Sequence, residues 1–316
     1  MSKTEIIVIE ELSKKYSGFT ALDKLNLKIS SNTCVGFLGP NGAGKSTTIK
    51  ILTGLLRPTS GKAYISGWDV TKNTQSALSN VGAVVETPEF YPNLSPQEVL
   101  SYFGKLRGMS KSDIKSRTQG VLDLVGLDKW RKKKIGKFSK GMKQRVAIAC
   151  ALLHDPSIII VDELTAGLDP RGIIEVREIL KSLKKKGKTI FMSSHLLGET
   201  QEICDMVALL DKGKLLRYDK VSNIENISKN SRIKIETFGV ISESDMSMIS
   251  NLQGVVEIKK ESPSAFDVKF NGGLDARAEF LKNLQVQGIK VVTFKSLGSD
   301  LESLYMDLVS QSEGDT

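Results

Sequence analysis

A glycine-rich loop of eight residues, G-P-N-G-A-G-K-S at positions 39–46, restricts the possible folds of this chain more than any other segment. It follows a short apolar run at residues 34–38, typical of a strand, and precedes helical spacing at residues 47–56. A strand, a G-x-x-x-x-G-K-[ST] loop and a helix in this order are typical of a phosphate-binding loop. Its glycines let main-chain N–H groups converge on phosphate oxygens, and the following helix points its positive end at the same anion. An ordinary Gly-rich turn is the alternative, but the Lys-Ser pair at the start of the helix disfavours it.

Two side chains at the end of this phosphate loop are predicted to act on the nucleotide directly. Lys45 supplies a full positive charge to the outer phosphates, and the Ser46 hydroxyl can ligate Mg²⁺. The other positions contribute main-chain contacts. The residues predicted to contact the bound nucleotide are Gly39, Pro40, Asn41, Gly42, Ala43, Gly44, Lys45, Ser46 and Thr47.

A second apolar run, at residues 157–161, ends in two carboxylates, Asp162 and Glu163. A continuous apolar run is expected for a strand buried on both faces of a parallel sheet. Because ligands bind at the carboxyl edge of such a sheet, both carboxylates should lie beside the phosphate loop. We predict that Asp162 holds Mg²⁺ through water, and that Glu163 orients and polarises the attacking water. A solvated strand end is the alternative for an acidic pair considered alone.

The spacing of apolar residues divides the chain into an α/β domain at residues 4–222 and a small α+β accessory domain at residues 230–316. In the first domain we expect a parallel sheet core, an antiparallel β part and a helical insert at about residues 88–150. Ser95 and Glu98 have the pattern of a capped helix start. Beyond residue 230, the order strand, helix, strand, strand, helix, strand is ferredoxin-like, and a helix is predicted to follow at residues 301–309.

Composition bears on where the chain works. No apolar stretch approaches the roughly 20 residues that span a bilayer, and the first residues lack the layout of a signal peptide. The three cysteines have neither a disulfide framework nor a metal-binding spacing, which favours a reducing cytosol. The net charge of +9 is compatible with an anionic membrane face, nucleic acid or anionic substrates. We therefore expect any membrane-spanning part of the system to be another chain.

Three further motifs occur in the order and spacing of one family. Residues 138–142 read F-S-K-G-M ahead of an apolar helix, residues 166–170 read A-G-L-D-P after the acidic strand, and residues 193–195 read S-S-H at the end of the next strand. Together with the phosphate loop and the acidic pair, they make residues 4–220 resemble the ATP-binding subunit of an ABC transporter. The resemblance implies an ATPase domain that uses ATP and Mg²⁺ to power transport.

The resemblance also implies a role for each matching position. Residues 138–142, the signature segment, stand where the family has L-S-G-G-Q and contacts the γ-phosphate of ATP held by the opposite subunit. Ser139 and Gly141 match this pattern, and the other three positions depart from it. A hydroxyl, small residues and a helix N-terminus suit an anion. Asp169 matches the family's residue that crosses the dimer interface.

Four single positions complete the comparison with the family. His195 matches the histidine that contacts the γ-phosphate, and Tyr16 matches the aromatic residue that stacks on adenine. Glu86 replaces the usual Gln that reaches the metal and the attacking water, and we hypothesise that it ligates Mg²⁺. Leu164 replaces the usual Pro after the catalytic Glu, for which we expect a modest backbone effect. The second histidine, His154, is interpreted as structural.

The chain contains one phosphate loop and one signature segment, so each complete site needs two copies and a homodimer is expected. The segments E-T-P at residues 86–88, F-Y-P-N-L at residues 90–94 and S-D-L-E-S-L-Y at residues 299–305 resemble the drug- and bacitracin-resistance exporters. That branch implies export through a separate permease, with this subunit on the cytoplasmic face of the membrane.

Two other functions remain open from the sequence. A soluble ABC-type ATPase acting on nucleic acid or ribosomes is the main alternative, and the positive net charge permits it. Such proteins usually carry two ATPase units or a long coiled-coil insertion, and this chain has neither, so we expect no nucleic-acid partner. A regulatory GTPase would need an N-K-x-D motif to read the base, and the sequence lacks one.

Overall fold

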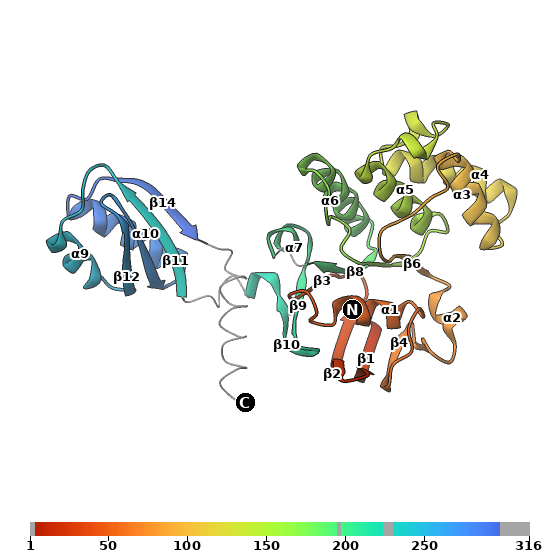
Figure 1. Cartoon of the computed structure of the whole chain (residues 1–316), viewed down its shortest axis with the longest axis horizontal. Helices are drawn as coiled ribbons and strands as arrows, with labels where there is room; N and C mark the ends of the chain where they lie inside the picture. The colour runs from red at the N-terminus through yellow and green to blue at the C-terminus, as the bar shows by residue number, and fades with distance from the viewer. Residues whose placement is uncertain (1–3, 195–196, 224–229, 298–316) are drawn as a thin grey trace. The chain divides into compact units, whose positions relative to one another are not determined.

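The computed structural model describes residues 4–194, 197–223 and 230–297. Contacts between Cα atoms divide the chain into two compact units, Met1–Asp219 and Lys220–Thr316. Each unit has its own strands and helices (Figure 1). Each unit also has its own hydrophobic core. The helix predicted at residues 301–309 lies outside the described residues.

The core of the first unit is a six-stranded sheet in the order β10-β9-β3-β8-β7-β6. The ladders from β9 to β6 are parallel, which confirms the α/β prediction. Strands β3 and β7 are buried along their whole length, as their continuous apolar sequences predict. The strands span Cys34–Leu38 (β3), Val81–Val84 (β6), Ile158–Val161 (β7), Thr189–Ser194 (β8), Met206–Asp211 (β9) and Lys214–Lys220 (β10).

An antiparallel sheet in the order β2-β1-β4-β5 forms the second β layer of this unit. One hydrophobic cluster includes residues of both sheets and the buried apolar side chains of helix α1, Lys45–Leu52. This packing fixes α1, and with it the end of the phosphate loop, against the parallel sheet. The strands are Glu5–Tyr16 (β1), Phe19–Ser30 (β2), Ser60–Ile65 (β4) and Trp68–Asp69 (β5).

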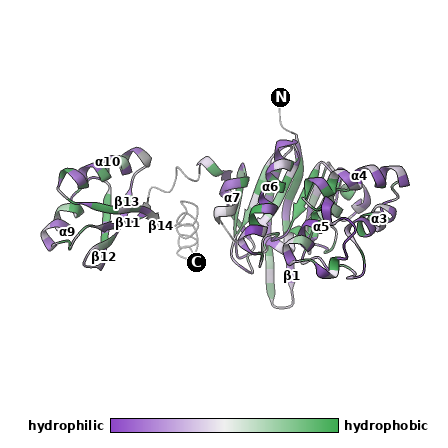
Figure 2. Cartoon of the chain, turned by 90° about the horizontal axis from the view of Figure 1, so that it is seen from above, coloured by the Kyte–Doolittle hydropathy of each residue, from purple (hydrophilic) through white to green (hydrophobic). Residues whose placement is uncertain are grey.

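Helices make up the rest of the first unit, and many of them alternate hydrophobic and hydrophilic residues (Figure 2). The predicted capped helix start is confirmed, because the Ser95 side chain accepts from Glu98 N while the Glu98 carboxylate accepts from Ser95 N at 2.7 Å. The helical segments are Thr74–Leu78 (α2), Pro96–Leu106 (α3), Lys111–Leu124 (α4), Asp128–Trp130 (η1), Ile135–Lys137 (η2), Lys140–Leu152 (α5), Pro170–Lys185 (α6) and Leu197–Ile203 (α7). No helix of the described residues is long and apolar enough to span a bilayer.

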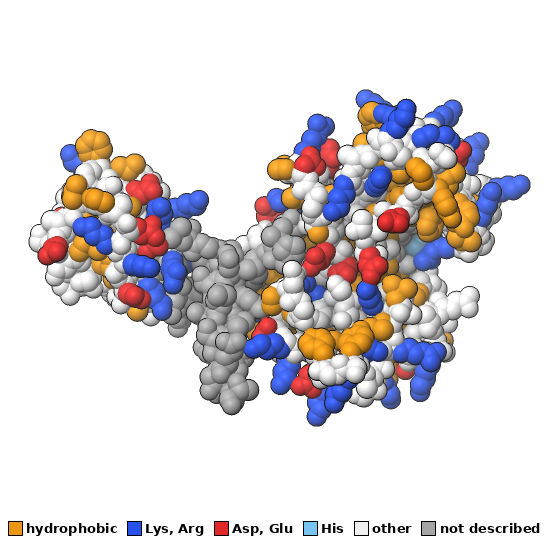
Figure 3. Space-filling view, viewed as in Figure 1, with side chains coloured by type: hydrophobic (Ala, Val, Ile, Leu, Met, Phe, Trp, Pro, Cys, Tyr) orange, Lys and Arg blue, Asp and Glu red, His pale blue; other side chains and the backbone are white. Residues whose placement is uncertain are grey.

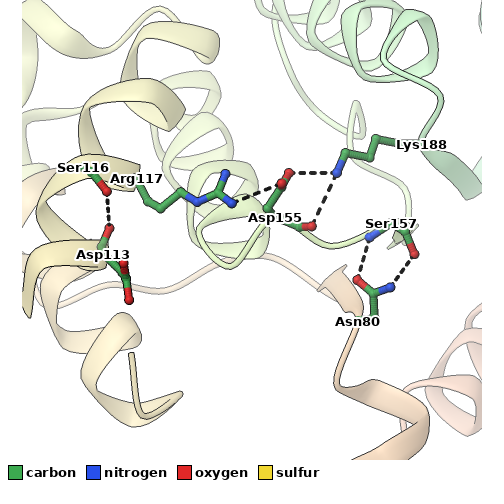
Figure 4. A network of polar contacts seen from close by, with 7 residues as sticks. All are labelled: Asn80, Asp113, Ser116, Arg117, Asp155, Ser157 and Lys188. Carbon is green, nitrogen blue, oxygen red and sulfur yellow. Dashed lines mark hydrogen bonds and ion pairs between the residues drawn. The ribbon is translucent and has the colours of Figure 1, made fainter. Parts of the chain in front are cut away.

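A polar network joins the helical insert to the parallel sheet (Figure 4). The Asp155 carboxylate accepts from Lys188 Nζ at 2.8 Å and from Arg117 Nη2 at 3.1 Å. Close by, the Asn80 and Ser157 side chains bond to each other at 2.7 Å. These contacts connect α4 with the segments that enter β7, which ends at the acidic pair, and β8, which ends at Ser193 and Ser194.

The second unit has the predicted ferredoxin-like order. Its four strands form an antiparallel sheet in the order β12-β13-β11-β14. Alternate side chains of β11 and β13 pack with the two helices into a core around Phe266, Phe270 and Phe280. The elements are Asn230–Thr237 (β11), Glu243–Ser250 (α9), Val255–Ser262 (β12), Ala265–Asn271 (β13), Leu274–Val286 (α10) and Val291–Leu297 (β14).

Candidate active site

The phosphate loop connects β3 to α1, and its glycines are required for two different reasons. Gly44 has φ +104°, and a Cβ there would come within 2.6 Å of the Ala21 carbonyl oxygen. Gly42 also has a positive φ, +86°, but a Cβ there would meet nothing within 4 Å. Gly44 therefore lets the loop pack against β2, whereas Gly42 keeps the main chain open to an approaching ligand.

Lys45 is a buried cation at the first turn of α1, with a side chain only 4% exposed. Its ammonium donates to the carbonyl oxygens of Gly39 at 2.8 Å and Pro40 at 3.0 Å, and lies 3.7 Å from Glu163 Oε1. Burial lowers the pKa of Lys45, and the charges of Glu163 and Asp162 oppose that shift. A buried cation held mainly by neutral carbonyls gains from a polyanion, which supplies stronger acceptors.

The acidic pair lies at the carboxyl end of β7, where the sequence places it. Its neighbour is Ser193 on β8, because the parallel register pairs Val161 with Met192. The Ser193 hydroxyl donates to Asp162 Oδ1 and accepts from Glu163 N at 3.0 Å. Ser193 belongs to the S-S-H motif that ends this strand, but nothing in that motif predicts this contact with the acidic pair.

Glu163 has φ +42°, a left-handed conformation that is rare for residues other than glycine. Such conformations cost roughly 1–3 kcal/mol and cluster at functional sites. The following residue, Leu164, is buried and 3% exposed. The turn after β7 therefore directs the Glu163 side chain towards Lys45 while its main chain is anchored on both sides.

Glu86 follows β6 and is held by α1. Its carboxylate lies 2.6 Å from Lys50 Nζ, and Lys50 is four residues after Ser46 on the same helix. The hydrogen bond from Lys50 lowers the pKa of Glu86, so this side chain is ionised. The structure thus brings Glu86 to the helix that follows the phosphate loop, through Lys50.

Tyr16 ends β1 with its ring half exposed, and the Lys14 ammonium lies 5.2 Å from the ring centroid. An exposed ring of this kind can stack on a base. His195 lies outside the described residues. His154 Nε2 is 3.1 Å from the Val81 carbonyl oxygen, a structural contact.

The signature segment and Asp169 form helix starts. Ser139 caps α5 by accepting from Met142 N, and Asp169 caps α6 by accepting from Gly172 N at 3.3 Å. The Lys140 ammonium donates to the Ala166 carbonyl oxygen at 2.8 Å, which ties this segment to the loop after Glu163. Within the described residues, no hydrogen bond or ion pair joins Ser139, Gly141 or Asp169 to the phosphate loop.

Comparison with known proteins agrees with this arrangement. Residues 22–166 match the ABC transporter family. The bacitracin transport ATP-binding protein BcrA of Bacillus licheniformis is 46% identical over 212 residues, which cover 67% of this chain and 68% of that protein. The linearmycin resistance ATP-binding protein LnrL of Bacillus subtilis is 30% identical over 96% of this chain and 98% of its own length.

The chain belongs to the ATP-binding proteins of ABC transporters. Its ABC-type ATPase fold is also that of a solved dimeric cassette, MJ0796 bound to ADP and Pi, with a TM-score of 0.61 and 27% identity over 68% of this chain and 99% of that one. The predicted family and its bacitracin- and drug-resistance branch are confirmed. The alternative of an ATPase acting on nucleic acid has no support among these relatives, so this ABC protein is an ATP-binding and ATP-hydrolysing subunit of a transporter.

Proposed function

We propose that this subunit hydrolyses ATP with Mg²⁺ to drive export through a permease encoded on another chain. The observation that carries the proposal is the convergence of Lys45, Asp162 and Glu163 at one edge of the parallel sheet, with Lys45 Nζ and Glu163 Oε1 3.7 Å apart. Export is supported by the bacitracin transport and linearmycin resistance proteins that the chain resembles over most of its length.

The oxygen donors near the phosphate loop fit Mg²⁺, which prefers hydroxyl and carboxylate oxygens. Ser46, at the start of α1, and Asp162, held by Ser193, would hold the ion, and Glu86 would add a ligand if it leaves Lys50. Bound Mg²⁺ would neutralise charge on the outer phosphates. Lys45 would exchange its carbonyl partners for phosphate oxygens, and Glu163 would orient a water towards the γ-phosphate.

The complete site would form between two copies. Ser139, Gly141 and Asp169 have no polar contact with the phosphate loop of their own chain within the described residues, and they sit at helix starts that suit an anion. A second copy could present them to the γ-phosphate. ATP would then favour the closed dimer because it supplies contacts that exist only in that state, and hydrolysis would reopen it.

A surface beside Glu86 fits the permease. A groove of about 380 Å³ runs between β6, α3 and α5, and Glu86, Phe90 and Phe103 line it. Phe103 in this groove and Tyr91, the residue after Phe90, are exposed. Figure 3 shows a hydrophobic area over the helical part of this unit. An exposed apolar area of this kind marks a protein–protein contact. Docking here would couple Glu86 to the membrane subunit and place the chain at the cytoplasmic face.

The test is a Glu163→Gln variant analysed by size-exclusion chromatography with ATP and Mg²⁺. Removing the carboxylate should stop hydrolysis and leave ATP bound, so the variant should elute as a dimer while the wild type returns to a monomer. Glu178→Gln, on the exposed side of α6, is the matched control and should behave as the wild type. A Glu163→Gln variant that stays monomeric under saturating ATP would refute the two-copy site.

A further inference from the structure

A cavity between α3 and α4 lies away from the candidate active site. Its volume is about 440 Å³. One face of each helix lines the cavity, with lining side chains about four residues apart along the helix. These polar lining residues are Gln97, Ser101 and Lys105 on α3, Lys111, Lys115 and Gln119 on α4, and Arg131 after η1.

The charge of this α3–α4 cavity is uniformly positive. Lys105, Lys111, Lys115 and Arg131 line it, and no carboxylate does. The three lysines are exposed and form no ion pair within the described residues. In the Asp155 network, by contrast, one carboxylate partners both nearby cations (Figure 4). The three lysines therefore concentrate positive charge with no ion pair in the described residues, and only Arg131 among the cavity cations lies near a carboxylate, that of Asp128.

Arg131 differs from the lysines because its guanidinium is held in place. Its Nη1 donates to Gln119 Oε1 at 2.7 Å and lies 3.6 Å from Asp128 Oδ1. A fixed guanidinium presents its remaining N–H groups as a planar fork, which suits phosphate oxygens. Lys111 and Lys115 are one turn apart on α4, a spacing at which like charges repel and destabilise a helix. An anion bound between them would relieve that repulsion.

The floor of the cavity is apolar. Ile114 and Leu122 are buried beneath the lysines. Tyr102 and Leu106, one turn apart on α3, are 53% and 65% exposed next to the cavity-lining face of the helix. Figure 3 shows Lys and Arg side chains around the hydrophobic area over this helical part. An apolar floor below a cationic rim suits a phosphate group that carries an apolar substituent.

We infer that the α3–α4 cavity binds a phosphate-bearing anion, either the headgroup of an anionic lipid or a free phosphate compound. The three lysines attract it and Arg131 fixes its phosphate. Near an anionic surface each lysine is worth about 1 kcal/mol, so three together correspond to roughly a hundredfold in affinity at low salt. This site is separate from the phosphate loop and independent of the proposed export function.

Two probes separate the sources of the phosphate. Flotation with vesicles of phosphatidylcholine, with and without phosphatidic acid, tests the lipid. Calorimetry with inorganic pyrophosphate, in saturating ADP so that the phosphate loop is occupied, tests the free anion. The full chain is compared with a Lys105→Gln, Lys111→Gln, Lys115→Gln variant. The matched control replaces by Gln three other exposed lysines whose side chains form no hydrogen bond or ion pair within the described residues, Lys62, Lys72 and Lys185.

The inference predicts that the full chain binds at least one probe, that the cavity variant binds it at least tenfold more weakly, and that the control keeps its affinity. Both variants should retain ATP hydrolysis, since none of these lysines lies in the active site. The probe that binds identifies the source. Absence of binding to both probes would overturn the inference. An equal loss of affinity in the control variant would also overturn it, because the binding would then depend on net charge alone.

Discussion

The Ser193 hydroxyl donates a hydrogen bond to the Asp162 carboxylate across the parallel ladder between β8 and β7. The same hydroxyl accepts from Glu163 N, so one side chain fixes both members of the acidic pair. Ser193 is buried and only 1% exposed. The position of the two carboxylates relative to Lys45 therefore depends on the Ser193 hydroxyl, which lies at the end of a third strand, β8.

Ser193→Ala tests this dependence. The change leaves the Glu163 N–H without its acceptor and Asp162 without its donor, at a cost of about 1–3 kcal/mol in stability. A displaced acidic pair should also lower ATP turnover by roughly 10- to 100-fold. Thr189→Val is the matched control, because it removes a buried hydroxyl at the other end of β8 that accepts from Asn32 N. If both variants lose turnover equally, Ser193 acts only through stability.

Glu86→Gln should raise the Mg²⁺ concentration needed for half-maximal ATP hydrolysis. The amide keeps one oxygen but loses the charge that Lys50 now stabilises. Lys50→Met removes the Glu86–Lys50 ion pair but leaves the Glu86 carboxylate. It therefore separates a role of Glu86 as a metal ligand from an effect of the lost ion pair. Metal titration of turnover in both variants is the measurement. Unchanged Mg²⁺ dependence and turnover in Glu86→Gln would end the hypothesis that Glu86 ligates the metal.

His154 should make the folded state sensitive to mild acid. Burial, with the nearby charge of Arg107, lowers the pKa of His154 to about 4 from its usual 6.5. Between these values the unfolded chain binds the proton more readily, so stability should fall as pH decreases from about 6.5 to about 4. Thermal unfolding across this range should show a shallower slope in His154→Gln than in the wild type. Parallel slopes would show that His154 does not contribute.

The proximity of Lys45 to the acidic pair was predictable from the sequence because it depends on local patterns. The phosphate loop has a fixed spacing, and a buried strand that ends in Asp162 and Glu163 has few positions available in a parallel sheet. The roles of Ser193 and Lys140 were not predictable in the same way. Their partners depend on which strands and loops are neighbours, and strand order is not encoded in periodicity.

The boundaries of the helices and strands were also only partly predictable from local patterns. The spacing of apolar residues predicts strands at residues 6–10 and 25–29, but the observed strands are longer, Glu5–Tyr16 and Phe19–Ser30. Register shifts interrupt this antiparallel pair, and Glu11 and Lys24 have positive φ, so the regular alternation breaks inside each strand. The spacing of apolar residues also predicts a helix from about residue 173, but α6 begins at Pro170, because Asp169 caps it and proline is accepted in the first turn.

ATP turnover by a purified Lys45→Ala variant tests the nucleotide site most directly. Lys45 is the buried cation between the phosphate loop and Glu163. Its loss should reduce turnover by at least ~100-fold, because the transferred phosphate would lose a positive charge that stabilises it. Lys62→Ala, an exposed lysine on β4, should keep wild-type turnover. Full turnover in folded Lys45→Ala would contradict the assignment of this site.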